Sequence, residues 1–211
     1  MSILTSKYRN QMRKWPVLFT ALSILIVIPS ARAQVSYVRP NSFEVGPFVG
    51  VTYGLDATRV LSGGNLTYAV TKRILPYLEY SYFPPLLRSE VASNGYNAST
   101  RVPVNDLHGG VHIRFPFHES PIVPYAVIGF GALFYPQRTI TFSTISQGQL
   151  PPPPPIQVQS ASNFAANFGG GIRYYFGQQW GMRLEAKVYK PTGEYTTAFG
   201  KVEVGLFYQF R

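Results

Sequence analysis

The sequence predicts an all-β protein, an eight-stranded antiparallel transmembrane up-and-down β-barrel. Three observations lead to this fold class. Successive segments alternate apolar and polar residues with a period of two, which places neighbouring side chains on opposite faces of a strand. The connections between these segments alternate between short and long, as they do in a barrel with two unlike rims. The chain also begins with a leader, which is typical of an exported protein.

The leader comprises residues 1–33 and is predicted to be a cleavable signal peptide. Four basic residues precede an apolar core of twelve residues at 17–28, and small residues follow at Ala31 and Ala33. An apolar core of this length is too short to span a membrane as a helix, which takes about 20 residues. An uncleaved anchor is the alternative. We expect the general secretory route, with a mature barrel domain at residues 34–211 that begins at Gln34.

The amino-acid composition argues against several classes of protein. The formal net charge of +10 falls to +5 without the leader, which carries five basic residues and no acidic one. The basicity therefore gives little support to nucleic-acid binding, and we expect no nucleic-acid partner. The absence of cysteine excludes disulfides and a lipoprotein anchor. Tyr and Phe, fifteen each, and nineteen Gly are typical of β-proteins.

The last ten residues show the alternation most clearly, because five apolar side chains fall on one face of an extended strand. A helix would scatter the same residues around its circumference. The polar and small residues of this stretch fall on the other face. The five residues of the apolar face are Val202, Val204, Leu206, Tyr208 and Phe210.

Seven further segments are predicted strands. Most are long enough to cross a bilayer at a tilt. Phe48 interrupts the alternation of the first strand, and the segment 123–135 is apolar on both faces, so its facing is not predicted. The seven segments are 42–54, 64–71, the stretch around 78–82, 104–115, 123–135, 163–176 and 180–189.

The connections distinguish the two rims. Short turns are predicted at 72–73, 116–121 and 177–179, and longer loops at 55–63, 84–103, 136–162 and 191–198. Short periplasmic turns and long extracellular loops are the pattern of outer-membrane barrels. The polar face of the strands is rich in Gly and Ala rather than in scattered Lys and Glu. This composition favours a narrow lumen over the water-facing surface of a soluble barrel.

The mature chain resembles the OmpA/OmpX-type family of eight-stranded outer-membrane barrels. The resemblance lies in the opening Phe43-Glu44-Val45-Gly46, in Pro124-Tyr125, and in a last strand that ends in Phe. In the family this Phe is usually the final residue, whereas Arg211 follows it here. The resemblance implies a bacterial outer-membrane location, with outer-membrane lipids and lipopolysaccharide as partners. It also implies that the apolar face of the last strand is an assembly signal for the barrel-assembly machinery.

Charged residues of the polar face are predicted to meet inside the barrel. An unpaired buried charge is costly, so we expect them to form ion pairs that plug the narrow interior. A charge gate, which would make the protein a minor pore for ions or very small solutes, is the alternative. Glu44 is expected to reach the charges of the last two strands once the barrel closes. The residues are Glu44, Glu79, Glu185 and Glu203, with Arg114, Arg173, Arg183, Lys187 and Lys201.

An enzymatic alternative rests on Asp106 and His108, which point the same way and are predicted to lie near the long-loop rim. Some outer-membrane barrels that are proteases or lipid A modifiers place such groups at this level. Residues two apart on a strand are about 7 Å apart, too far for an ordinary direct hydrogen bond. We therefore predict that the protein is not an enzyme and holds no cofactor or metal.

Two remaining features concern the outer surface. Residues 151–155 are five consecutive prolines and are predicted to form an extended polyproline II segment. This segment either stiffens its loop or serves as a docking strand for an external partner. Such a partner would bind through the loops 84–103 and 136–162. The sequence thus predicts a structural or surface-interaction protein of the bacterial envelope.

Overall fold

The computed structural model describes residues 37–54, 58–91, 96–117, 120–145, 151–192 and 197–210. The predicted signal peptide lies outside the described residues. No helix in the described ranges is long and apolar enough to span a membrane. The strands are β1 (Ser42–Tyr53), β2 (Arg59–Ala69), β3 (Ile74–Val91), β4 (Asn97–Arg114), β5 (Ile122–Tyr135), β6 (Arg138–Ser143), β7 (Ile156–Val158), β8 (Ala161–Tyr175), β9 (Trp180–Pro191) and β10 (Phe199–Phe210).

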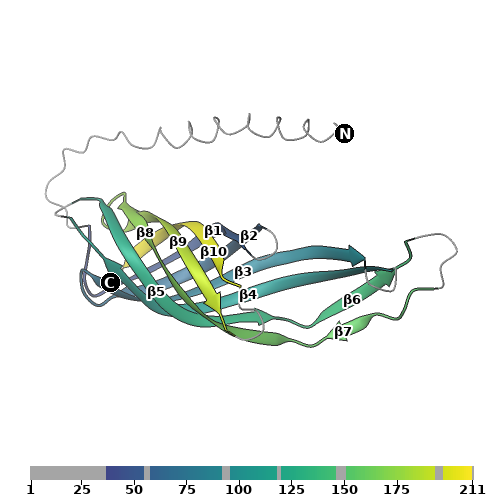
Figure 1. Cartoon of the computed structure of the whole chain (residues 1–211). Coiled ribbons are helices and arrows are strands. Elements are labelled where there is room, and N and C mark those ends of the chain that lie inside the picture. Colours follow the sequence, from purple (N-terminus) through teal and green to yellow (C-terminus); the bar gives the residue numbers. More distant parts are fainter. Residues whose placement is uncertain are drawn as a thin grey trace, which may run out of the picture. The chain divides into compact units, whose positions relative to one another are not determined.

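Eight of these strands close into an antiparallel barrel (Figure 1). The first strand, β1, pairs with both β2 and β10, and the sheet continues through β9, β8, β5 and β4. The remaining strand, β3, pairs with β2 and with β4, which joins the two ends of the sheet. Closure removes free edges from the barrel wall. The predicted eight-stranded antiparallel up-and-down barrel is confirmed.

Side chains alternate between the interior and the outer wall. On β9, Arg183, Glu185 and Lys187 are at most 2% exposed, whereas Leu184 between them is 51% exposed. The outer wall is thus apolar and the interior polar, the reverse of a soluble barrel. This is the arrangement that a lipid-facing wall requires.

The structure also shows which side chains face the interior in two places where the sequence did not predict it, on β5 and at Phe48. On β5, Val123 and Tyr125 face the interior and are buried. Phe48 on β1 lies inside as well, at 3% exposure, and so follows the alternation. Glycines make room for its ring, because a Cβ on Gly63 would lie 2.4 Å from the ring and one on Gly205 would lie 2.9 Å from the Phe48 Cβ.

The predicted loops 84–103 and 136–162 contain a large share of strand, so this part of the prediction was wrong. The hairpin of β3 and β4 continues beyond the barrel, β6 pairs with residues 97–100 of β4, and β7 pairs with β6. The outer parts of β3 and β4 together with β6 and β7 form an open sheet beyond the rim, here called the extension (Figure 1). The pentaproline segment 151–155 lies in no strand and precedes β7.

Proline explains the error. Pro84 and Pro85 suggest a loop in the sequence. Among the described residues, however, the pairing of β3 with β2 ends at Tyr82, and the register of β3 with β4 shifts between Phe83 and Leu86. Proline is tolerated on such a free edge and at a bulge, because no ladder hydrogen bond needs its missing N–H. Pro103 lies between the part of β4 that pairs with β5 and the part that pairs with β6.

The opposite rim carries the short connections at 70–73, 115–121 and 176–179, and is here called the turn rim. Residues 37–41, ahead of β1, and the end of β10 also lie there. At the other rim, β2 begins at Arg59 rather than near residue 64, so the first of the predicted long loops is shorter than expected. The barrel interior lies between these two rims.

Candidate functional site: the barrel interior

An apolar layer closes the interior at each rim. At the turn rim, Val38 from the segment before β1 packs with Val123, Tyr175 and Phe207. Nine buried residues form the layer toward the extension. They are Phe48, Leu61, Phe83, Val102, Val104, Leu133, Ala165, Tyr189 and Phe199. The charged side chains lie between these two layers.

The charged cluster nearer the turn rim is centred on Glu44. Its Oε1 lies 3.1 Å from Arg114 Nη1, and its Oε2 pairs with Arg173. The Thr67 hydroxyl donates to Glu44 Oε2 over 3.2 Å, and Arg114 donates to the Tyr175 hydroxyl over 3.0 Å. The predicted contact of Glu44 with the last two strands was wrong. Its partners lie on β4 and β8 across the lumen, which strand order along the sheet does not predict.

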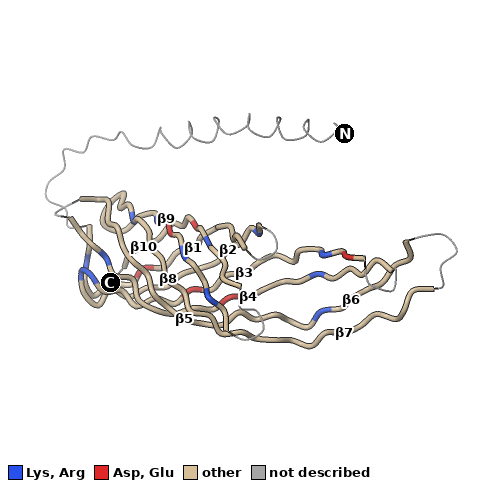
Figure 2. The backbone as a smooth tube through the Cα atoms, in the orientation of Figure 1, with Lys and Arg blue, Asp and Glu red and all other residues tan. Residues whose placement is uncertain are grey.

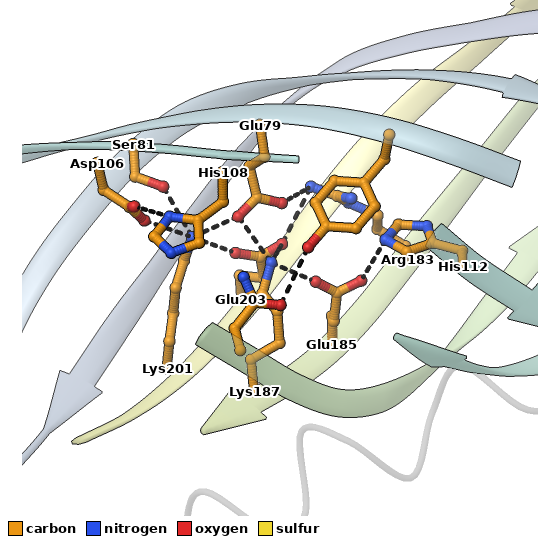
Figure 3. Close-up of polar contacts among 12 residues, drawn as sticks. Glu79, Ser81, Asp106, His108, His112, Arg183, Glu185, Lys187, Lys201 and Glu203 are labelled. Atoms are coloured by element: carbon orange, nitrogen blue, oxygen red, sulfur yellow. Dashed lines mark hydrogen bonds and ion pairs between the residues drawn. The ribbon is translucent and has the colours of Figure 1, made fainter. Parts of the chain in front are cut away.

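The central cluster is organised around Glu79 of β3 (Figure 3). Glu79 Oε1 lies 2.7 Å from Lys187 Nζ and 2.6 Å from Lys201 Nζ, and Oε2 lies 3.4 Å from Arg183 Nη2. These three cations come from β9 and β10, on the far side of β1 and β2. One carboxylate therefore links strands that are not neighbours in the wall.

Two further carboxylates complete this cluster. Glu185 Oε1 lies 2.6 Å from Lys187 Nζ, and Glu203 Oε2 lies 3.0 Å from Lys201 Nζ. Glu203 Oε1 also lies 3.0 Å from Arg183 Nη2. Each lysine thus bridges two carboxylates, which holds β9 and β10 to the opposite wall.

Asp106 and His108 differ from their prediction in two ways. His108 Nδ1 forms a hydrogen bond directly with Asp106 Oδ1 (Figure 3). The spacing of about 7 Å holds for backbone positions two apart on a strand, whereas two side chains on the same face can lean together. Both residues also lie beneath the apolar layer rather than at the rim, at 1% and 0% exposure. Lys201 Nζ lies 3.9 Å from Asp106 Oδ2 and 2.7 Å from Ser81 Oγ.

The charges of these two clusters balance. Every one of these side chains is at most 2% exposed, and each has an ion-pair partner within the barrel. Figure 2 shows acidic and basic positions interspersed along the barrel strands. Mutual neutralisation is required because an uncompensated charge in a low-dielectric interior is strongly destabilising. The five carboxylates are Glu44, Glu79, Asp106, Glu185 and Glu203, and the five cations are Arg114, Arg173, Arg183, Lys187 and Lys201.

A sixth buried cation, Arg59, begins β2 at the extension end and stands apart from these clusters. Its Nη1 donates to the carbonyl oxygen of Val102 over 3.1 Å.

The three central carboxylates have the spacing of a metal site. One oxygen from each of Glu79, Glu185 and Glu203 lies within 4.8 Å of the others. In this arrangement the ammonium groups of Lys187 and Lys201 already contact these oxygens at 2.6–3.0 Å. The lysines thus supply the positive charge that a bound cation would otherwise provide.

Sequence reasoning missed several aromatic and amide groups of the interior. The Tyr125 hydroxyl donates to Glu185 Oε2 over 2.5 Å, and the Tyr77 hydroxyl donates to Asn167 Oδ1 over 3.0 Å. Tyr77 is two residues from Glu79 and so lies on the same face of the strand. The alternation could therefore have predicted that Tyr77 faces the interior. Tyr125 belongs to the strand that is apolar on both faces, where no such signal exists.

The predicted assembly residues lie on the outer wall of β10. Val204, Leu206 and Phe210 are 41%, 51% and 40% exposed, and Val202 and Tyr208 on the same face are half-buried. Because β10 pairs with both β9 and β1, this strand closes the barrel.

A family model for the outer membrane protein beta-barrel domain matches residues 19–210 of the chain. The chain belongs to this family. The protein is therefore a barrel of the bacterial outer membrane, which agrees with its apolar outer wall and its polar interior.

Solved structures show the same likeness. Neisserial surface protein A is 10% identical, with 80% of this chain and 96% of that chain covered and a TM-score of 0.53. A major outer membrane protein from Thermus thermophilus is 11% identical, with 80% and 98% covered and a TM-score of 0.50. The N-terminal β-barrel domain of OprF from Pseudomonas aeruginosa is 17% identical, with 81% and 98% covered and a TM-score of 0.48. At these identities the first two likenesses show the fold alone. No curated protein matches the sequence.

Proposed function

We propose that this protein is a structural barrel of the outer membrane whose lumen is plugged by ion pairs and whose extension is a surface for interactions outside the cell. The observation that supports this proposal is the balanced set of buried ion pairs enclosed between two apolar layers. Such a network joins opposite walls of the barrel. It therefore acts as internal cross-bracing rather than as the lining of a channel.

A minor pore for ions or very small solutes is less compatible with this geometry. A pore needs a continuous wet path, and the side chains that fill the centre of the barrel are almost fully buried. Opening such a path would separate Glu79 from at least one of its lysines. This would leave a charge without its partner in a confined space.

An enzymatic role is supported by one observation, the direct hydrogen bond between Asp106 and His108. The remaining ring nitrogen of His108, Nε2, lies 3.2 Å from the Ala165 carbonyl oxygen. A substrate would have to cross the apolar layer of the extension end to reach either group. We therefore propose that this pair is structural, and that the protein has no enzymatic activity and no cofactor.

We also propose a route to the membrane. The chain is exported by the general secretory route, cleaved before Gln34, and inserted by the barrel-assembly machinery, which reads the outer face of β10. Cell fractionation with N-terminal sequencing tests this route. A mature N-terminus that retains residues 17–28, or a soluble periplasmic product, would overturn it.

Single-channel recording of the purified, refolded barrel in a planar bilayer tests the plug. We expect no steady conductance from the wild-type protein, and a higher conductance from Glu79→Gln, which removes the charge at the centre of the network. A wild-type barrel that conducts steadily would replace the plug with the pore.

A further inference from the structure

The pentaproline segment, residues 151–155, is a part of the extension that the proposed plug does not explain. It lies in no strand and leads directly into β7, from the end of the extension that is farther from the barrel (Figure 1). Strand β7 pairs with β6 through Ile156, Gln157 and Val158 and is the last strand of the sheet. The chain is therefore held immediately after the segment, at the edge of the extension.

The five prolines determine the conformation of this segment. Each proline ring fixes its own φ near −65°, and a residue that precedes a proline is kept out of the helical region. Such a run adopts polyproline II, which has three residues per turn and a rise of about 3.1 Å per residue. The segment therefore has three edges. Pro151 and Pro154 share the first edge, Pro152 and Pro155 share the second, and Pro153 lies on the third. The two prolines of a pair are about 9 Å apart along the axis.

The exposure of the five side chains distinguishes these edges. Pro151, Pro152, Pro154 and Pro155 are exposed, whereas Pro153 is half-buried. The third edge is thus the one turned toward the rest of the protein. The two edges that carry a pair of prolines are both accessible.

The backbone of the segment is also available to a partner. Proline has no N–H, so residues 151–155 have only carbonyl oxygens to offer. Among the described residues, no N–H or O–H group donates a hydrogen bond to these oxygens. A segment that only stiffened its loop would use neither the free acceptors nor the two open edges. Both features favour the docking strand over the stiffener.

The segment is rigid before any partner arrives. Its ring constraints leave little freedom within the run. At its C-terminal end, the Gln137 side chain donates a hydrogen bond of 2.8 Å to Gln157 of β7. A preformed polyproline II segment loses little conformational entropy on binding, which is the advantage that proline-rich ligands have over flexible peptides.

We propose that residues 151–155 are a docking strand for a protein domain whose groove is lined by tryptophan and tyrosine side chains. The aromatic rings pack against the prolines of the two open edges, and indole N–H and phenol O–H groups donate to the free carbonyl oxygens. The inference rests on the proposed function, because it needs the extension outside the cell, and it names the kind of partner that the extension binds.

Binding of the purified, refolded barrel in detergent micelles to immobilised domains that recognise polyproline II tests this inference. The probes are a purified SH3, WW and EVH1 domain, which are three such classes. The test variant, Pro152→Ala with Pro154→Ala, removes one proline from each pair. Pro153→Ala is the control, since it changes the third edge and leaves both pairs intact. Heat-modifiable migration in electrophoresis verifies that each variant is folded.

We expect at least one of the three domains to bind the wild-type barrel, and free poly-L-proline peptide to compete for this binding. The test variant should bind that domain at least about tenfold more weakly, because truncation of anchor residues removes most of the affinity of a small interface. Pro153→Ala should bind within about threefold of wild type, since a residue outside the contact contributes little. All variants should fold as the wild type does, because the segment belongs to no strand.

Four outcomes would overturn the inference: no binding by any of the three domains, binding that poly-L-proline does not compete for, equal binding by wild type and the test variant, or an equal loss in Pro153→Ala. The same domains, labelled and applied to intact cells, test where the extension lies. Binding to the purified barrel but not to cells would overturn the external location and leave the recognition of the segment standing. A conducting barrel would overturn the plug alone, so these failures are distinguishable.

Discussion

Charged side chains are paired in the barrel interior but not throughout the extension. In the interior, Glu79 and its partners are fully buried, and each of the ten charges of the two clusters meets an opposite one. In the extension, the exposed Arg101 forms no ion pair among the described residues. Buried charges that neutralise each other stabilise a fold, whereas uncompensated charges on an accessible surface are available to a ligand. The same residue types are thus structural in one region and suited to binding in the other.

The sharpest test of this difference is the loss of one carboxylate from each region. Glu79→Gln should lower the free energy of unfolding by about 3–5 kcal/mol, because it leaves buried cations without a counter-charge. Glu90→Gln in the extension should change it by less than about 0.5 kcal/mol, as surface substitutions usually do. Urea titration of the refolded barrels measures both. Similar midpoints for the two variants would show that the interior charges are not desolvated.

An arginine substitution on the outward face should have different effects in the two regions, because that face contacts lipid in the barrel and water in the extension. Val204→Arg places a charge on the lipid-facing wall of β10 and should destabilise the barrel by about 2–4 kcal/mol near the midplane of the bilayer. Val91→Arg, at a residue 71% exposed in the extension, should be almost neutral because its side chain meets water. The measurement is the folded fraction in lipid vesicles, read as heat-modifiable migration. Equal folding of both variants would contradict the assigned facing of β10.

A smaller effect is expected from two adjacent glycines of β2. A Cβ on Gly63 would lie 2.4 Å from the Phe48 ring and 2.1 Å from the Tyr80 carbonyl oxygen, whereas one on Gly64 would meet no atom within 4 Å. Gly63→Ala should therefore destabilise the barrel by about 1–3 kcal/mol, as overpacking does. Gly64→Ala should change the urea midpoint very little. A larger loss for Gly64→Ala would mean that Phe48 does not fill the lumen.

The alternation of the sequence predicted the wall of the barrel well, because a period of two assigns a face to each residue with no knowledge of its neighbours. All nine predicted interior charges are buried in the structure. Within the barrel wall, the alternation left the facing open where a strand is apolar on both faces, as in the stretch that holds Tyr125.

The pairing of these charges could not be predicted in the same way. Glu44 meets Arg114 and Arg173 across the lumen, and such contacts depend on barrel diameter and side-chain reach rather than on strand order. The contact of Asp106 with His108 depends on side-chain rotamers, which a backbone spacing does not give. The strands of the extension were not predicted, because their prolines suggested loops. These prolines lie at a free edge, where they do not prevent strand formation.

Thiol accessibility tests the central claim most directly, namely that the interior is sealed and the extension is open. The chain has no cysteine, so a single engineered one is a unique label. Ser81 is fully buried beside Lys201, and Ser89 is exposed in the extension of the same strand, β3. With the barrel in lipid vesicles, a small water-soluble thiol reagent should modify Ser89→Cys completely and leave Ser81→Cys unmodified over the same time. Comparable modification of the two cysteines would contradict the sealed interior.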